Sequence, residues 1–339
     1  MQPQELIYKA LAGDRLALTR LLSLFENQTD DLAEIMEQIH PHTGKAHRIG
    51  ITGAPGTGKS TLTTCLTSAF RKQDKTVAIL AIDPSSPFSG GALLGDRIRM
   101  RELAGDSGVF IRSMATRGHT GGIASAAYQA IALFDAVGFD IVLIETVGAG
   151  QGEVEIASMA HTTIVVEAPG LGDEIQANKA GILEIADIFV INKADLPGAI
   201  QTENALRSVF DVNHNTVHKH LRDIDISEPK DESSSHEVQW HCQILKTVAR
   251  TCEGIDNLVT AIHEHASHLI KTDRWYAKVA LQYDRQFESH LSKALFASWK
   301  ASLTPEDLDN LNKQLNCRIH APEFLAEKVL NGVSISQKK

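Results

Sequence analysis

The chain has 339 residues, 43% of them hydrophobic, and a formal net charge of -9 at pH 7. This size and composition allow a full hydrophobic core, so we expect one main domain with helical additions. The negative charge argues against a broad basic surface for nucleic acid or anionic lipid. No apolar run approaches the roughly 20 residues of a membrane-spanning helix, and the first residues resemble neither a signal peptide nor a transit peptide. The sequence therefore predicts a cytoplasmic protein without nucleic-acid or membrane partners.

The cysteines offer no evident disulfide framework. They are Cys65, Cys242, Cys252 and Cys317, which lie far apart in the sequence and form no C-x-x-C pair. This spacing argues against both a disulfide scaffold and a thiolate metal site, so we expect plain thiols.

Residues 1–45 predict an N-terminal helical extension, because apolar residues from Leu6 to Ile39 recur at the spacing of two or three short helices. From His47 on, short β-rich runs alternate with longer amphipathic segments. The runs are RIGIT, TVAILAID, GVFIRSM, FDIVLIET, HTTIVVEA and DIFVIN. Strands separated by helices predict an α/β fold with a doubly wound, mainly parallel sheet. We assign residues 46–270 to this domain, with an exposed loop at 224–237 and a closing helix over 255–269.

Residues 271–339 predict a C-terminal helical arm. Phe287, Leu291, Leu295 and Trp299 repeat every fourth residue, which places them on one helical face. That face is either core packing within one chain or the seam of a homodimer. A second helix should begin after Thr304, because a capping threonine is followed by a proline and two acidic residues.

A phosphate-binding loop follows the first predicted strand. Its sequence fits G-x-x-x-x-G-K-S/T in a strand, loop, helix context. The residues are Gly53, Ala54, Pro55, Gly56, Thr57, Gly58, Lys59 and Ser60, with Thr61 next in the helix. Glycines let backbone N–H groups turn toward phosphates, while Lys59 would reach the β/γ oxygens and Ser60 would bind Mg²⁺. The sequence therefore predicts a P-loop NTPase.

The choice of base rests on a second motif, Asn192-Lys193-Ala194-Asp195, after the strand DIFVIN. The Asp195 carboxylate can accept hydrogen bonds from N1–H and N2–H₂ of guanine, a donor arrangement that adenine lacks. Asn192 would contact the guanine edge and hold the loop, and the stem of Lys193 would lie along the ring. This motif predicts GTP and GDP as the nucleotides.

Further acids could complete a magnesium site. Glu145 ends the apolar strand IVLIE and would hold a Mg²⁺-bound water, and the amide of Gly148 would meet the γ-phosphate. Asp83 and Asp96 are further candidates for the Mg²⁺ shell or for orienting water, although each could instead shape a turn. The alternative for Glu145 is a structural acid that caps the next loop, but the two motifs already placed favour the Mg²⁺ role. No glutamine directly follows Gly148, which predicts slow hydrolysis without a partner.

The histidines do not form a recognisable metal motif. His263, Glu264, His265 and His268 approach H-E-x-x-H, but Ser267 occupies the position of the second histidine. His214 and His218 are four residues apart, yet no third ligand is evident, so a solvated helix face is favoured.

Longer blocks of sequence resemble one known family. They include GDRLALTRLLSLFEN, AIDPSSPFSGGALLGDRIRM, SMATRGHTGGIA, LIETVGAGQGE and APGLGDEIQANKAGILEIADIFVINKADLPGA, within roughly residues 10–270. With these blocks the chain resembles the ArgK/MeaB family of P-loop GTPases, chaperones of cobalamin-dependent methylmalonyl-CoA mutase. The resemblance implies that Asp83 and Asp96 are Mg²⁺-associated acids, that Glu145 is the Walker B acid and that residues 172–179 form a switch toward the mutase.

The resemblance thus predicts a homodimeric GTPase that uses Mg²⁺ to gate cofactor loading of a cobalamin-dependent acyl-CoA mutase and to protect it. Lys59, Asp96, Glu145 and Gly148 are the candidate catalytic residues. Two alternatives are a metallochaperone GTPase for nickel or cobalt insertion and a kinase-like ATPase of amino-acid transport. Ignoring the resemblance, residues 172–179 could be a flexible surface loop.

Overall fold

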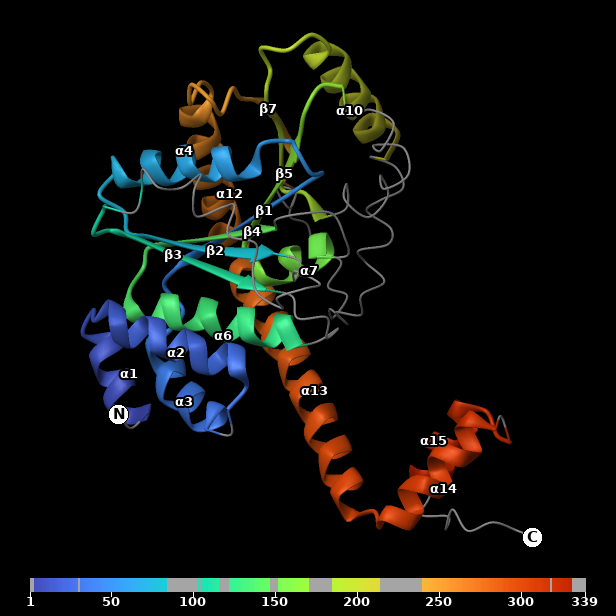
Figure 1. The fold of residues 1–339 in the computed structure, drawn as a ribbon. Helices are drawn as coiled ribbons and strands as arrows, with labels where there is room; N and C mark the ends of the chain where they lie inside the picture. Colours follow the sequence, from blue (N-terminus) through green and yellow to red (C-terminus); the bar gives the residue numbers. More distant parts are fainter. Residues whose placement is uncertain are drawn as a thin grey trace, which may run out of the picture. The chain divides into compact units, whose positions relative to one another are not determined.

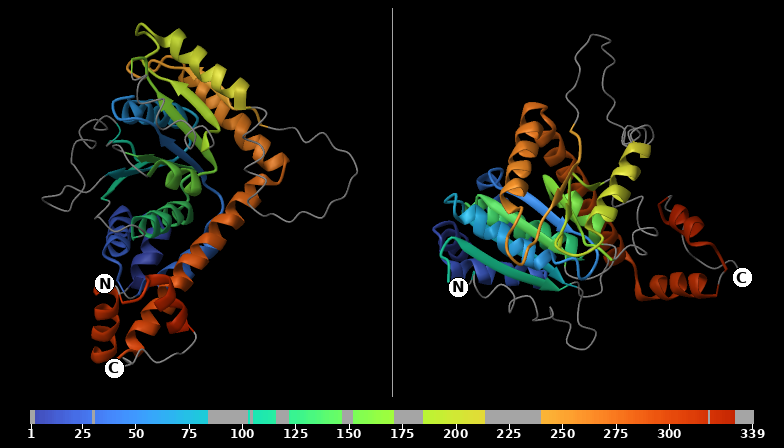
Figure 2. Two further views of the ribbon diagram at one scale, coloured as in Figure 1. Left: turned by 90° about the vertical axis from the view of Figure 1, so that its right-hand side faces the viewer. Right: turned by 90° about the horizontal axis from the view of Figure 1, so that it is seen from above.

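The structure is a computed structural model that describes residues 3–29, 31–83, 103, 105–115, 122–146, 152–170, 185–213, 240–317 and 319–330. It forms two compact units, Met1–Val279 and Ala280–Lys339. Figures 1 and 2 show the elements of each unit. Within the described parts, no helix combines the length and apolar character needed to cross a bilayer. The three-part division expected from the sequence stays a prediction.

The first unit is built on a seven-stranded sheet in the order β3-β2-β4-β1-β5-β6-β7, with every neighbouring pair parallel. The strands are β1 (His47–Thr52), β2 (Val77–Asp83), β3 (Val109–Ala115), β4 (Ile141–Thr146), β5 (Thr162–Glu167), β6 (Ile188–Ile191) and β7 (Gln243–Lys246). The six predicted strands and the parallel α/β class are confirmed. Strand β7 has no counterpart in the prediction, because its four residues, QILK, are only partly buried at the sheet edge and carry a weak strand signal.

Helices cover both faces of this sheet (Figures 1 and 2). They are α1 (Pro3–Leu11), α2 (Arg15–Asn27), α3 (Leu32–Ile39), α4 (Lys59–Arg71), α6 (Gly122–Val137), α7 (Gly152–Met159), α10 (Ala199–Asn213) and α12 (Ile255–Lys271), with a 3₁₀ turn at His40–His42. Side chains of α6, α7 and the N-terminal helices pack on one face, and those of α4 and α12 pack on the other. The closing helix predicted over 255–269 is confirmed as α12.

Strand β2 shows how the sequence produces this layering. Ala78 and Leu80 join the core on the α6 side, while Val77 and Ile79 join the core on the α4 side. Because side chains alternate along a strand and both faces are covered, β2 reads as an almost unbroken apolar run. Burial on both sides is typical of a parallel sheet.

The N-terminal helices belong to the core of this unit. Leu21, Leu22 and Phe25 of α2 are fully buried in the cluster that includes α6. Asp14 caps α2 by accepting hydrogen bonds from two backbone N–H groups of its first turn. The predicted short helices are therefore present and pack on α6, which covers this face of the sheet.

The expectation that all cysteines are thiols is wrong. Cys65 on α4 and Cys252 in the turn before α12 form a disulfide, although they are 187 residues apart in the sequence. Packing of α12 against α4 brings them together, and sequence spacing carries no signal of that contact. Cys242 and Cys317 are free. The loop predicted at 224–237 lies outside the described residues.

The described part of the second unit is helical. It holds the later part of α13 (Arg274–Ser302), with α14 (Pro305–Asn316) and α15 (Pro322–Leu330). Thr304 caps α14 in a capping box with Asp307, which confirms the predicted helix start. Phe287, Leu291 and Leu295 on α13 are exposed.

A buried polar network lies at the amino ends of the central strands. His47 Nε2 is 2.8 Å from Thr162 Oγ1, and the same hydroxyl is 2.9 Å from His265 Nδ1. His265 Nε2 lies 3.2 Å from an oxygen of Asp187, which also faces Lys278 of α13. The network attaches the first turns of α13 to the sheet, at the end opposite the phosphate-binding loop.

Burial holds two histidines of this region neutral. Desolvation, with the nearby cationic side chain of Lys278, lowers the pKa of His47 to about 3. Desolvation and Arg48 lower the pKa of His161 well below its usual value. Burial alone would raise the pKa of Asp187, but Lys278 and His265 lower it to about 2.

These shifts predict acid destabilisation. An unfolded histidine binds a proton below its usual pKa of about 6.5, whereas native His47 stays neutral down to about pH 3. Since the unfolded state then binds more protons, the free energy of unfolding falls as the pH drops through this window. His47 alone should account for about 2 kcal/mol between pH 7 and pH 5.

Urea unfolding at pH 7 and pH 5 measures this effect. His47→Gln, which keeps a polar partner for Thr162, should show a smaller pH-dependent loss than the wild type. The matched control is His42→Gln at an exposed position, which should keep the wild-type loss. Equal losses in the wild type and His47→Gln would contradict the assignment.

Candidate nucleotide-binding site

The phosphate-binding loop connects β1 to α4 at the carboxyl edge of the sheet. Gly53, Gly56 and Gly58 all have positive φ, at 134°, 79° and 92°. A side chain at Gly53 would collide with the carbonyl oxygen of Val166 on the neighbouring strand. Only glycine combines these backbone angles with so close an approach, so the loop sequence follows directly from its path.

The first turn of α4 places Lys59 and Ser60 at the loop. Both residues are buried, although Ala54, Pro55 and Gly56 of the loop are partly or fully exposed. Lys59 Nζ donates hydrogen bonds to the carbonyl oxygens of Gly53, at 2.7 Å, and Ala54, at 3.0 Å. The ammonium group thus folds back over its own loop, at the amino end of a helix that favours anions.

An acid from β4 meets this turn. Ser60 Oγ donates a 2.5 Å hydrogen bond to Glu145 Oε1, and the Glu145 side chain is fully buried. Asp83 ends β2, whose preceding residue Ile82 pairs with Thr146 of β4, so the backbone of Asp83 reaches the same edge. Hydroxyl and carboxylate oxygens are the ligands that Mg²⁺ prefers, and this donor set fits the ion.

The Asn192 side chain links the second motif to the phosphate-binding loop. Its Nδ2 donates to Thr57 O at 2.8 Å, and its Oδ1 accepts from Thr247 Oγ1 at 3.1 Å and from Ala249 N at 2.9 Å. A side chain at Gly58 would collide with the same Asn192 amide. Asn192 therefore holds the loop on one side and the segment after β7 on the other.

The next residues of the motif extend from β6 toward solvent. Lys193 has a positive φ of 56°, and its Nζ donates to Gly56 O at 2.7 Å. The backbone N–H of Ala194 donates to Thr247 O at 3.0 Å. Asp195 is exposed, as a carboxylate that accepts hydrogen bonds from an incoming base must be.

Other predicted site residues are not described by the structure. Asp96, Gly148 and the segment 172–179 lie outside the described residues, as does the side chain of Asp83. The structure thus brings together the phosphate-binding loop, Glu145 and the 192–195 motif. His214 and His218 are outside as well, and among the described residues no cluster of three His, Cys, Asp or Glu side chains could hold a metal.

Thr247 and Ala249 had not been identified from the sequence. Both supply hydrogen bonds to Asn192 and lie just after β7. The sequence offers a threonine and an alanine after a four-residue strand, which is too weak a pattern to distinguish. Only the pairing of β7 with β6 brings them to the base motif.

The sheet order, the phosphate-binding loop and the linked base motif define a P-loop nucleotide hydrolase. A profile of the family described as methylmalonyl Co-A mutase-associated GTPase MeaB matches residues 18–303. The chain therefore belongs to this family of GTPases and is an enzyme that hydrolyses GTP. The family predicted from the sequence is confirmed.

Individual relatives agree with this family. A protein of Pyrococcus abyssi that carries the name GTPase is 40% identical to this chain. The match covers 97% of this chain and 96% of the relative's own length. GTPase ArgK of Escherichia coli is 32% identical over 90% of this chain and 85% of its own. The mouse protein named methylmalonic aciduria type A homolog, mitochondrial, is 34% identical over 80% of this chain and 65% of its own.

A solved structure shares the fold. The LAO/AO transport system kinase aligns with a TM-score of 0.67 over 98% of this chain and 97% of that chain, at 23% identity. At this identity the likeness is evidence for the fold alone.

Substitution of Asp195 tests the base site. Asp195→Asn replaces a hydrogen-bond acceptor by a donor, so the preference should shift from guanine toward xanthine, whose edge presents an oxygen at that position. We expect the ratio of GDP to XDP affinity, measured by calorimetry, to fall by at least about tenfold. Asp256→Asn, at an exposed position in the first turn of α12, is the matched control. An unchanged ratio in Asp195→Asn would place the guanine pocket elsewhere.

Proposed function

We propose that this GTPase chaperones a cobalamin-dependent acyl-CoA mutase of the methylmalonyl-CoA mutase type, gating cofactor loading and protecting the enzyme. The observation that carries the proposal is the match of residues 18–303 to a family described as associated with that mutase. The name of the mouse relative, which refers to methylmalonic aciduria, supports it. The cytoplasmic location stays a prediction.

The site geometry supports a role for each of its residues in GTP hydrolysis. Lys59 would exchange its bonds to Gly53 O and Ala54 O for the β- and γ-phosphate oxygens, guided by the amino end of α4. Ser60 and Glu145, with Asp83 and Asp96, are the residues that would hold Mg²⁺. When bound, the ion would neutralise charge on the phosphate oxygens.

The described residues also suggest how base and phosphate sites communicate. Asn192 and Lys193 both donate to carbonyl groups of the phosphate-binding loop, at Thr57 and Gly56. A shift of the base motif would therefore displace the loop that holds the phosphates. Glu145 lies two residues before the segment 147–150, where Gly148 would meet the γ-phosphate.

A partner should accelerate hydrolysis. Because no glutamine follows Gly148 directly, the chain has no evident group to position the attacking water, and its basal rate should be slow. We propose that residues 172–179 receive the mutase, since they lie in the sequence between the γ-phosphate and guanine motifs. Phosphate release should rise at least about tenfold when a cobalamin-dependent mutase is added.

Lys179→Ala should reduce that stimulation while leaving basal hydrolysis and GTP affinity unchanged. The matched control is Lys72→Ala, an exposed lysine directly after α4, which should be stimulated like the wild type. Equal stimulation of the wild type, Lys179→Ala and Lys72→Ala would show that Lys179 does not couple mutase binding to GTP hydrolysis. Lack of stimulation by any such mutase would favour the metallochaperone alternative, and transfer of the γ-phosphate to a protein would favour the kinase alternative.

We further propose that the protein is a homodimer joined through its second unit. Phe287 and Leu295 on α13 are 67% and 61% exposed, which is unusual for large apolar side chains at helical spacing. Burial of this stripe against a second copy would remove it from water. The stripe thus favours a dimer seam over core packing within the chain.

Truncation after Val279 should give a monomer that still binds GDP. This cut keeps Trp275 and Lys278, which pack on His161 of the first unit, so it is better placed than a cut at residue 271. Analytical ultracentrifugation should show a dimer for the full chain and a monomer for the truncated form. If the truncated protein remains dimeric, the dimer interface lies in the first unit and the proposed seam on α13 is wrong.

A further inference from the structure

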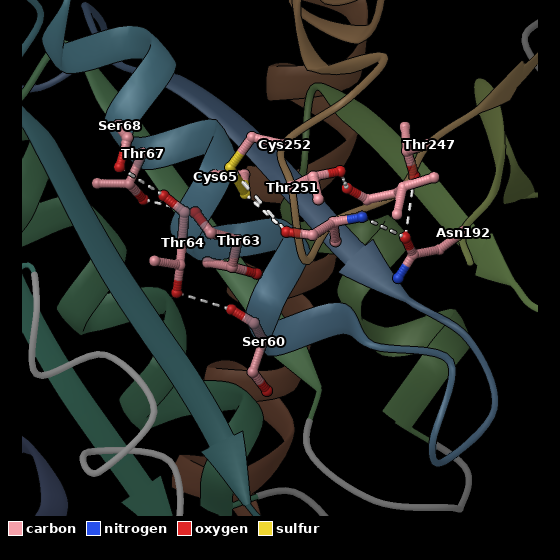
Figure 3. The surroundings of a disulfide bond; sticks show 12 residues. Ser60, Thr63, Thr64, Cys65, Thr67, Ser68, Asn192, Thr247, Thr251 and Cys252 are labelled. Carbon is pink, nitrogen blue, oxygen red and sulfur yellow. Dashed lines mark hydrogen bonds between the residues drawn. A yellow bond between two sulfur atoms is a disulfide. The ribbon is translucent and has the colours of Figure 1, made fainter. Parts of the chain in front are cut away.

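The disulfide joins the two sides of the nucleotide site. Cys65 lies on α4, five residues after Ser60 and thus on the helix that begins at the phosphate-binding loop. Cys252 lies in the turn between β7 and α12 (Figure 3). The bond therefore connects the phosphate-binding helix to the segment beside the base motif.

This turn also holds Asn192. The backbone N–H of Ala249 and the hydroxyl of Thr247 both donate to Asn192 Oδ1. Figure 3 shows Thr247 beside Asn192. Cys65 Sγ lies 3.0 Å from the carbonyl oxygen of the same Ala249. One residue thus contacts the disulfide through its carbonyl group and the base motif through its amide.

Hydrogen bonds around Val248 also restrain this turn, since the backbone N–H of Thr251 donates to Val248 O at 3.0 Å. Val248 and Glu253 form an isolated antiparallel bridge, with N–H···O distances of 3.1 and 3.3 Å. Cys252 adopts a left-handed φ of 56°, which is unfavourable for a residue with a side chain. The disulfide adds a covalent restraint to Cys252 in this conformation, and its cleavage would remove that restraint from the turn.

We propose that the Cys65–Cys252 disulfide is a redox-sensitive clasp that slows release of guanine nucleotide. The clasp rests on the proposed binding of the base beside Asn192 and Asp195. In the oxidised protein, Thr247 and Ala249 keep Asn192 in place against Thr57, so base and phosphate sites stay assembled. In the reduced protein the turn moves more freely, and the nucleotide leaves faster.

The exposure of the two residues indicates how a dithiol reductant would open the clasp. Cys252 is exposed, whereas Cys65 is 5% exposed. A thiolate of the reductant attacks Cys252 Sγ, the Cys65–Cys252 bond breaks, and Cys65 leaves as a thiolate that takes up a proton. The second thiol of the reductant then attacks the mixed disulfide and releases Cys252 as a thiol. The reductant ends as a disulfide, having supplied two electrons.

GDP release from the full-length protein tests the clasp. Dissociation of a fluorescent GDP analogue is measured for oxidised protein and after treatment with dithiothreitol, with the thiol state confirmed by alkylation and mass spectrometry. Reduction should accelerate release about tenfold, since ordering a loop at a binding site contributes an effect of this size. Reoxidation should restore the slow rate.

Variants separate the clasp from general effects of the reductant. Cys252→Ser, and Cys65→Ala as a second variant, should release GDP at the fast rate with or without dithiothreitol. Cys242→Ser removes a free cysteine instead and should respond to the reductant like the wild type. Loss of the response in Cys242→Ser would overturn the assignment to Cys65 and Cys252.

Two failures can be told apart. If oxidised and reduced protein both bind GDP and release it at the same rate, the clasp is wrong and the nucleotide site is retained. If neither form binds GDP, the proposed base site itself fails, and the clasp fails with it.

Discussion

The side chain of Asn192 holds the two halves of the nucleotide site together. Its amide nitrogen donates to the carbonyl of Thr57 in the phosphate-binding loop, and its amide oxygen accepts two hydrogen bonds from the segment after β7. The residue is almost fully buried. A buried amide with its hydrogen bonds formed is costly to disturb, since an unpaired polar atom there would lose water without compensation. Loop, base motif and β7 segment therefore keep a common geometry.

This geometry depends on the parallel sheet. The carboxyl ends of strands β1, β4, β5 and β6 all lie at one edge of the sheet. This is the edge at which an open α/β sheet binds ligands. β1 lies between β4 and β5, so the phosphate-binding loop emerges between Glu145 and the residues after β5. An acid, a lysine and an amide from distant parts of the sequence meet there because their strands are neighbours.

The amino-terminal edge of the sheet holds a buried polar network, not the nucleotide site. His47, Thr162, His265 and Asp187 form a buried polar chain at the amino ends of β1, β5 and β6. Lys278 and Trp275 join this region from the start of α13. The helix that continues into the second unit is thereby anchored by polar groups in the core of the first. Nucleotide chemistry and the attachment of α13 use opposite ends of the same strands.

Much of this protein could be read from its sequence, because the decisive patterns are local. Apolar runs of strand length predicted six of the seven strands, and the phosphate-binding loop and the 192–195 motif each lie within a few consecutive residues. Their roles follow from backbone angles and donor patterns that short segments determine. The start of α14 was equally predictable, since a capping box spans only four residues.

Contacts between distant segments required the tertiary structure. The Cys65–Cys252 disulfide, the hydrogen bonds of Thr247 and Ala249 to Asn192, and strand β7 all depend on the packing of elements that are 55 or more residues apart. The buried histidines gave no sign in the sequence that they belong to one network, because neutral histidine in a core and solvated histidine on a surface look alike. The sequence determined the chemistry of each motif and the order of the strands along the chain. The tertiary structure decided which motifs share an edge, because sheet order and helix packing set those distances and local sequence does not.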